Sequence, residues 1–121
     1  MAFDWSGFLD LAAELAARTD EAAHRSAISR AYYAALGKAR ELLEHEGEAF
    51  TSTENIHYLV WQTLSDSADD RRYYIGVDGN WLRRNRNAAD YESVLTDSKE
   101  RAAQSVRKAR ALLAALERVR S

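Results

Sequence analysis

Proline is absent from this chain of 121 residues, and its absence limits the possible folds more than any other feature. Proline ends or kinks helices, and the five glycines are too few to interrupt them often. Alanine and leucine fill most apolar positions, and both favour helix over strand. A chain of this length suits one hydrophobic core. The sequence therefore predicts an all-α protein with a single domain over residues 1–121.

The chain contains no cysteine, which excludes disulfides and thiolate-bound metals. Its first residues, Met1 to Trp5, lack the basic start and the unbroken apolar run of a signal peptide. No segment approaches the roughly 20 apolar residues that span a bilayer. We therefore expect a cytoplasmic protein with no membrane association.

The formal net charge of −2 hides an uneven distribution. Residues 1–70 hold 5 Lys/Arg and 13 Asp/Glu, whereas residues 71–121 hold 12 Lys/Arg and 6 Asp/Glu. The first part therefore carries −8 and the second +6. The basic part could attract phosphate, or the two parts could simply complement each other when packed.

Apolar spacing and capping residues divide the chain into helices. The expected elements are a helix from Ser6 to Arg18 capped by Asp4 or Ser6, a long helix from Thr19-Asp20 to Gly47, a helix opened by a capping box at Thr51-Ser52-Thr53-Glu54, an irregular connection from Ser65 to Asn80, a short helix from Trp81 to Ala89, and a last helix capped by Thr96 or Asp97 with Glu100 and ending near Val119. The predicted buried stripes contain Phe8, Leu11, Ala12 and Leu15; Ile28, Tyr32, Ala35, Leu36, Ala39, Leu42 and Leu43; Ile56, Leu59, Val60, Thr63 and Leu64; and Ala102, Val106, Ala109, Leu113 and Leu116. This order indicates an up-and-down bundle of four to five helices.

Residues with functional side chains are densest from Trp81 to Tyr91. On a helix, spacings of three, four and seven residues bring Arg83, Arg86, Asn87 and Asp90 to one face. Guanidinium groups offer a planar fork for phosphate, and the Asn87 amide and the Tyr91 ring could add hydrogen bonds or stack on a base. Alternatively, Arg86 and Asp90 form an ordinary ion pair four residues apart.

Two separated segments carry a resemblance to a known family. The first is Arg25-Ser26-Ala27-Ile28-Ser29-Arg30-Ala31-Tyr32-Tyr33-Ala34-Ala35-Leu36, and the second is Arg86-Asn87-Ala88-Ala89-Asp90-Tyr91. Both resemble the HEPN superfamily, in particular a branch with S-R-A-Y-Y-A and R-x-x-A-D-Y segments that is associated with nucleotidyltransferases. The resemblance implies a bundle of four or five helices, commonly a homodimer, with the arginine-bearing segments at a shared cleft.

The same resemblance implies either a ribonuclease, such as a toxin or a defence effector, or a non-catalytic module that binds RNA, a nucleotide or a nucleotidyltransferase. The nucleases carry an Arg, usually followed by a polar residue, with a His four to six residues on. Arg86-Asn87 matches the first half of this motif, but Asp90 and Tyr91 stand where the His is expected. Metal-independent RNA cleavage needs a proton acceptor and a proton donor near neutral pH, and imidazole fills both roles better than tyrosine or aspartate.

Five further residues bear on this question. His24 and His45 lie among charged neighbours and are expected to be solvated, whereas His57 could line the same cleft as the arginines. Arg30 and Tyr33, three residues apart, could face the Arg86 segment. In the alternative interpretation Arg30 pairs with an acid and Tyr33 covers the edge of the core.

The remaining motifs do not indicate a metal or a cofactor. Asp66, Asp69 and Asp70 are close in sequence, but neighbours in a loop seldom converge on one cation. The glycine-containing stretch from Ile75 to Asn80 follows no predicted strand and is interpreted as a turn into the arginine helix.

The preferred hypothesis is a non-catalytic HEPN-like module that binds RNA, a nucleotide or a nucleotidyltransferase, and the resemblance implies that it is a homodimer. The binding residues it names are Arg83, Arg84, Arg86, Asn87, Tyr91, Arg30 and Tyr33. The first alternative is a ribonuclease that uses Arg86 with Asp90, Tyr91 or His57, and the second is a purely structural interaction protein.

Overall fold

The computed structural model describes residues 2–51 and 55–120, which form five helices and no strand. The helices are α1 (Ser6–Ala16), α2 (Glu21–His45), α3 (Ile56–Ser65), α4 (Asp70–Tyr91) and α5 (Ser98–Val119). The prediction of an all-α bundle is therefore confirmed. None of these helices combines the length and the apolar character that crossing a bilayer requires.

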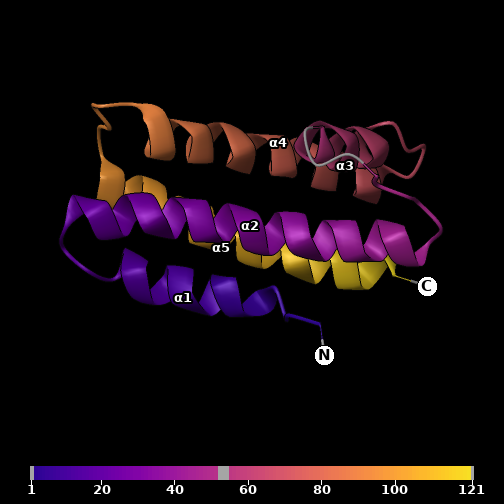
Figure 1. Ribbon diagram of the computed structural model, residues 1–121, viewed down its shortest axis with the longest axis horizontal. Helices are drawn as coiled ribbons and strands as arrows, with labels where there is room; N and C mark the ends of the chain where they lie inside the picture. The colour runs from indigo at the N-terminus through magenta and orange to yellow at the C-terminus, as the bar shows by residue number, and fades with distance from the viewer. Residues whose placement is uncertain (1, 52–54, 121) are drawn as a thin grey trace.

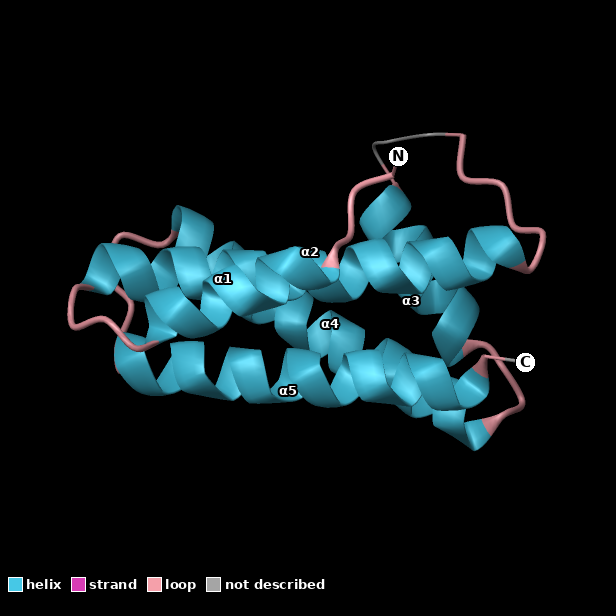
Figure 2. Cartoon of the chain, turned by 90° about the horizontal axis from the view of Figure 1, so that it is seen from below, coloured by secondary structure: helices cyan, strands magenta, loops and turns pink. Residues whose placement is uncertain are grey.

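The two long helices α2 and α5 pack together at the centre of the bundle, with α1 on one side and α4 on the other (Figure 1). Helices α1 and α4 run in the opposite direction to α2 and α5, as expected for an up-and-down arrangement. The short helix α3 packs mainly against α4 at the end of the bundle that also holds the C-terminus (Figures 1 and 2).

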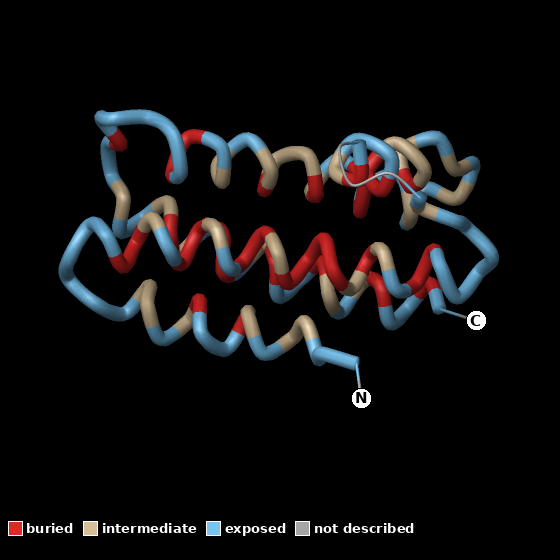
Figure 3. Tube along the Cα trace, viewed as in Figure 1, coloured by how far each residue is buried: buried red, intermediate tan, exposed pale blue. Residues whose placement is uncertain are grey.

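Alanine allows the close contact between α2 and α5. The face of α2 that is inaccessible to solvent includes Ala27, Ala31 and Ala35, and the facing side of α5 includes Ala102 and Ala109. Small side chains let two helix backbones approach closely. Buried residues accordingly run along the inward sides of the central helices (Figure 3). The alanine-rich faces are thus used inside the chain and do not form an exposed surface.

The long helix α2 begins and ends where the sequence predicts. The Asp20 carboxylate accepts a hydrogen bond from the Ala23 amide at 3.3 Å and caps the first turn. After His45 the chain turns through Gly47, whose φ of +103° suits glycine. Helix α1 is two residues shorter than predicted, and the Asp4 carboxylate accepts from the Ser6 amide at its start.

The predicted irregular connection from Ser65 to Asn80 is wrong, because α4 already begins at Asp70. The Asp69 carboxylate caps this helix by accepting from the Arg71 amide at 2.9 Å. Gly76 and Gly79 are buried inside α4 against α3, not in a turn. A Cβ on Gly76 would lie 2.7 Å from the Ser65 amide nitrogen and 2.8 Å from the Trp61 carbonyl oxygen, and a Cβ on Gly79 would meet the Trp61 ring. Glycine therefore serves here to bring α3 and α4 together.

Smaller differences concern stripes and caps. Leu9 and Leu112 are buried in place of the predicted Leu11 and Leu113, and Leu59 is exposed. Helix α5 begins at Ser98, and the preceding Asp97 has a left-handed backbone and no side-chain capping bond, so the predicted cap is not formed. Residues 52–54 of the predicted capping box before α3 lie outside the described residues.

Candidate functional site

The seam between α2 and α4 holds a pair of charged side chains, Arg86 and Asp90. Arg86 Nε lies 2.9 Å from Asp90 Oδ2, and only 16% and 27% of the two side-chain surfaces are exposed. The Nε–H is not directed along that line and has no hydrogen-bond partner, although Arg86 Nη1 donates to Asn87 Oδ1 at 2.9 Å. Ser29 on α2 donates weakly to Asp90 Oδ2 at 3.5 Å. The ion pair expected from the sequence is therefore present, and it leaves donor capacity on Arg86.

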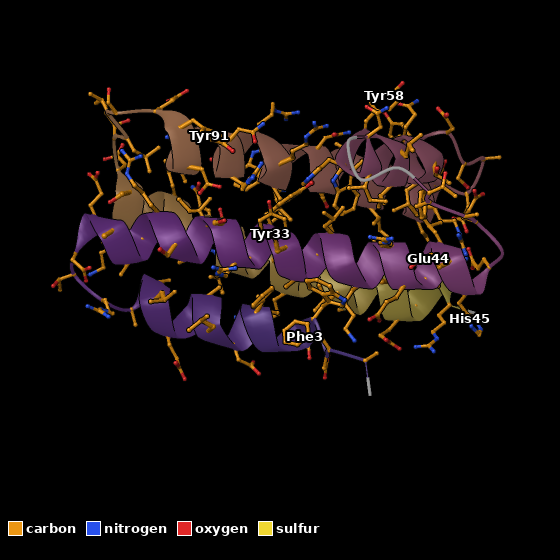
Figure 4. All side chains as sticks on the ribbon, in the orientation of Figure 1. Phe3, Tyr33, Glu44, His45, Tyr58 and Tyr91 are labelled. Atoms are coloured by element: carbon orange, nitrogen blue, oxygen red, sulfur yellow. The ribbon has the colours of Figure 1, made fainter. Side chains whose placement is uncertain are left out.

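Two tyrosine rings flank the Arg86 guanidinium. Its central carbon lies 5.3 Å from the centre of the Tyr33 ring and 5.7 Å from the centre of the Tyr91 ring. Both distances are within the range of cation–π attraction. Tyr33 lies between α2 and α4, whereas Tyr91 is at the end of α4 with 76% of its surface exposed (Figure 4). The guanidinium is thus held in place by aromatic contacts, with one ring open to solvent.

His57 on α3 reaches the same seam, as the sequence analysis considered. Its ring packs edge-on to Tyr33, with centres 6.1 Å apart, and its Nδ1 lies 2.6 Å from the Tyr32 hydroxyl. Partial burial lowers the pKa of His57, and the positive charges of Arg83 and Arg86 lower it further. A partly exposed neutral imidazole therefore lies in the electric field of both arginines.

Tyr32 lies beneath this histidine and is completely buried. Burial raises the pKa of its hydroxyl to about 12, although the Trp61 hydrogen bond and the charges of Arg83 and Arg86 act in the opposite direction. The hydroxyl is therefore protonated at any physiological pH. Sequence reasoning placed Tyr32 only in the core and missed its polar contact with the site, because a tyrosine in an apolar stripe gives no signal of its hydroxyl partner.

The other predicted binding residues divide into two groups. Arg83 is half-buried near His57, and Arg84 and Asn87 are exposed along α4. Arg30 is not brought to the cluster, because its guanidinium lies over the Phe8 ring of α1, 5.0 Å from the centre. We name the residues that the structure does bring together, Arg83, Arg86, Asn87, Asp90, Tyr91, Tyr33 and His57, the arginine cleft.

Arg25 has a structural role that the sequence analysis did not assign. Its Nη1 donates to the carbonyl oxygens of Ala89 at 2.9 Å and Glu92 at 2.6 Å. These contacts satisfy carbonyl groups at the C-terminal end of α4, which have no partner within the helix. Arg25 therefore fixes the end of α4 that carries Asp90 and Tyr91.

His24 is buried, so the expectation that it is solvated is wrong. Its Nδ1 lies 2.9 Å from Ser98 Oγ, and its Nε2 lies 2.6 Å from the Arg18 carbonyl oxygen. The ring thereby links the connection before α2 to the start of α5. Its charged neighbours in sequence point elsewhere, and this is why sequence position alone misplaced it.

Asp66 and Asp69, which precede α4, act separately, and Asp70 is the first residue of that helix. Asp69 caps α4 and pairs with Arg71, and Asp66 accepts from Gln62 at 2.7 Å. Within residues 2–51 and 55–120, no group of three or more acidic or histidine side chains converges in a way that could hold a metal ion.

Two hollows of the described surface lie away from the arginine cleft. One of about 560 Å³ lies between the C-terminal parts of α2 and α5, and another of about 600 Å³ lies between α4 and α5 beside Trp81. Neither includes Arg86 or His57 among its lining residues. The arginine cleft is therefore defined by its contacts and charges and not by either of these hollows.

A comparison with protein-family models identifies the domain. The model of the HEPN domain matches residues 8–119, which include every residue of the arginine cleft. The chain belongs to the HEPN domain family. No curated protein and no solved structure matches the chain significantly. The HEPN match includes α2 to α5 and α1 from Phe8 onward, so the arginine cleft lies within the matched domain.

The lowered pKa of His57 predicts a pH effect on the stability of this HEPN domain. An unfolded histidine titrates near 6.5, whereas folded His57 resists protonation until a lower pH. His57 therefore contributes stability fully above about pH 6.5, and that contribution is lost as the pH falls through the folded pKa. We expect the wild type to lose more unfolding free energy than His57→Asn across this window in urea titrations. His45→Asn, which removes an exposed histidine, should behave like the wild type.

Proposed function

We propose that this HEPN domain is a non-catalytic module that binds the phosphate groups of RNA or of a nucleotide in the arginine cleft. The observation that carries the proposal is the Arg86 guanidinium, held between the Tyr33 and Tyr91 rings with Arg83 nearby. Within the described parts of the chain, Arg83 and Arg84 have no carboxylate within ion-pair distance, so their charges are available. Tyr91 has an exposed face on which a base can stack.

The absence of cleavage is part of this proposal. The position of the nuclease histidine is taken by Asp90 and Tyr91, and Asp90 is engaged with Arg86 and Ser29. The Asp90 carboxylate already contacts a guanidinium and a hydroxyl group, so it is not free to contact a 2′-hydroxyl. The cluster therefore supports charge recognition better than proton transfer.

A ribonuclease remains a second candidate because His57 lies in the arginine cleft. A neutral imidazole beside two arginines has the chemical groups that phosphodiester cleavage needs. In this alternative Arg86 holds the scissile phosphate and His57 takes the proton of the 2′-hydroxyl, whose oxygen attacks the phosphorus. The bond to the 5′-oxygen then breaks, and Tyr91 gives that leaving oxygen a proton.

Binding and cleavage can be separated with the unmodified protein. We expect purified wild type to bind labelled single-stranded RNA, with an affinity that falls as salt rises because phosphate contacts release counterions. We expect no cleavage of the same RNA during hours of incubation with a chelator present. Robust metal-independent cleavage would favour the ribonuclease over the non-catalytic module. Binding of RNA that is absent or insensitive to salt would contradict both proposed functions.

We also propose that the domain forms a homodimer through the outer face of α4. The alanine-rich faces of α2 and α5 are buried inside the bundle, whereas Tyr73, Tyr74 and Val77 on α4 remain exposed. Tyr73, Val77, Asn80, Arg84, Asn87 and Tyr91 follow each other at alternating spacings of four and three residues. Such spacing forms a stripe along one side of a helix. An antiparallel pair of α4 helices would set Tyr73 against Tyr91 and Asn80 against Arg84.

The dimer should be visible by sedimentation equilibrium at tens of micromolar, an order suited to detecting moderate association. Val77→Glu, which places a charge in the apolar part of the stripe, should give a monomer with unchanged helix content. Val94→Glu is the matched control, because Val94 is exposed outside α4. A wild type that sediments only as a monomer would contradict the dimer. The sequence resemblance also indicates a nucleotidyltransferase as a partner. Co-purification of a nucleotidyltransferase with the wild type, Val77→Glu and Val94→Glu would test this partner.

A further inference from the structure

Three polar groups connect the core of the bundle to the arginine cleft. Trp61 on α3 and Tyr32 on α2 are completely buried, and the Trp61 Nε1–H donates to the Tyr32 hydroxyl oxygen at 3.1 Å. The Tyr32 hydroxyl in turn lies 2.6 Å from His57 Nδ1. The Tyr32 and His57 rings are nearly parallel, with 10° between their planes. The chain of contacts therefore runs Trp61, Tyr32, His57, from the interior outward.

The direction of these hydrogen bonds follows from the number of protons available. An indole nitrogen can only donate, so the Tyr32 oxygen must accept from Trp61. The single Tyr32 proton is then free to donate, and within the described residues His57 Nδ1 is the only other partner of this hydroxyl. If Nδ1 carried a proton and donated instead, the Tyr32 proton would be buried without an acceptor, which is costly. Tyr32 therefore donates, and His57 Nδ1 accepts.

We infer that His57 is locked in the tautomer that carries its proton on Nε2, and that it acts as a hydrogen-bond donor to a phosphate oxygen of the ligand in the arginine cleft. Nε2 is the ring nitrogen not bonded to Tyr32, on a side chain that is partly exposed. The ligand contact rests on the proposed phosphate-binding function, whereas the tautomer does not. Trp61 and Tyr32 are positioning residues in this arrangement, because they act through His57.

The lowered pKa of His57 is consistent with this tautomer. Protonation of the neutral ring would add a hydrogen to Nδ1, besides the one on Nε2, and this hydrogen would face the hydroxyl hydrogen of Tyr32. The nearby charges of Arg83 and Arg86 also disfavour an imidazolium. A neutral ring with a fixed N–H near two guanidinium groups offers one more donor to an oxyanion without adding a third charge.

The locked tautomer also bears on cleavage. To accept a proton from a 2′-hydroxyl, Nε2 would have to be free of hydrogen, which requires the proton to sit on Nδ1. That exchange would leave the buried Tyr32 proton without an acceptor. The same hydrogen-bond chain that equips His57 for binding therefore makes it a poor general base.

The tautomer can be measured directly in the free protein. Long-range proton–nitrogen correlation spectra distinguish the two neutral tautomers and the imidazolium, and the His57 signals are identified by their loss in a His57→Asn variant. At pH 7.5 we expect a protonated Nε2 and an unprotonated Nδ1 in the wild type, and a mixture of tautomers in Tyr32→Phe. A protonated Nδ1 in the wild type, or a Tyr32→Phe spectrum identical to it, would overturn the lock.

The ligand contact is tested by two substitutions of His57. One keeps a donor at the position of Nε2, and the other keeps an acceptor at the position of Nδ1. The Gln amide can reach the position of Nε2 and donate there, whereas the shorter Asn can supply only the acceptor at Nδ1. With inorganic phosphate and single-stranded RNA as probes, we expect His57→Asn to weaken binding about three- to tenfold, the range of one hydrogen bond. His57→Gln should retain most of the affinity, although its stability is lower because Tyr32 loses its acceptor.

The outcomes separate this inference from the proposed function. Equal affinities for wild type, His57→Asn and His57→Gln would overturn the donor role while RNA binding by the arginines stood. A wild type that binds neither probe would overturn the proposed function and the ligand contact together, and the spectra of the free protein would still decide the tautomer. Faster RNA cleavage by wild type than by His57→Gln would overturn the donor role in favour of a general base.

Discussion

Replacing Gly79 with alanine is expected to lower the free energy of unfolding by about 1–3 kcal/mol, the usual cost of forcing an extra group into a packed core. A Cβ at this position would overlap the Trp61 ring, which is completely buried and has no open space to move into. An alanine elsewhere in a helix normally stabilises it. The loss therefore reports the steric contact between α3 and α4 and can be measured by urea denaturation.

Gly7 provides the control, because a Cβ there would meet nothing within 4 Å. Gly7→Ala in α1 should leave stability unchanged or raise it by up to about 1 kcal/mol. Displacement of Trp61 in Gly79→Ala should also disturb the hydrogen bonds to Tyr32 and His57, which Gly7→Ala should not do. If Gly79→Ala is as stable as the wild type, the close packing of α3 on α4 is incorrect.

Gly79 also illustrates why part of the fold could be predicted and part could not. Helices α2 and α5 follow from local signals, since Asp20 caps one, alanines and leucines repeat along both, and proline is absent. In α4 the local signal is misleading, because Gly76, Asp78, Gly79 and Asn80 together are typical of a turn. These residues are helical because α3 packs against them. That contact comes from another part of the chain and cannot be predicted from the residues around Gly79.

The arginine cleft shows the same division. Arg83, Arg86, Asn87 and Asp90 could be grouped from helical spacing, and the Arg86–Asp90 pair follows from that spacing alone. Tyr33 and His57 reach the group from α2 and α3, and only the packing of these helices decides that they do. The prediction that Arg30 faces the Arg86 segment is wrong for the same reason, because its guanidinium lies over the Phe8 ring of α1. Contacts between helices, which spacing within one helix cannot reveal, account for each difference.

Arg86→Ala is expected to weaken RNA binding about ten- to a hundredfold at low salt, the range of a charge-assisted hydrogen bond to phosphate. The guanidinium contacts both tyrosine rings, so its removal also leaves Tyr91 without a partner that orders it. Because the lost interaction is largely electrostatic, the difference between variant and wild type should shrink as salt rises. Fluorescence anisotropy with labelled RNA at several salt concentrations measures both effects.

Stability must be measured on the same samples, because Arg86 also pairs with Asp90. The pair is largely buried, so removing the guanidinium leaves Asp90 without its partner and should reduce the unfolding free energy by about 1–3 kcal/mol. As long as the domain stays folded, this loss of stability does not by itself weaken binding. Arg107→Ala removes the same charge from an exposed pair with Glu100 on α5 and should alter binding little. If Arg86→Ala instead unfolds the domain, or if Arg107→Ala weakens binding equally, Arg86 acts in packing or as one of many surface charges. A loss of affinity in Arg86→Ala that is absent in Arg107→Ala, with the domain still folded, is the result that a phosphate site at this arginine predicts.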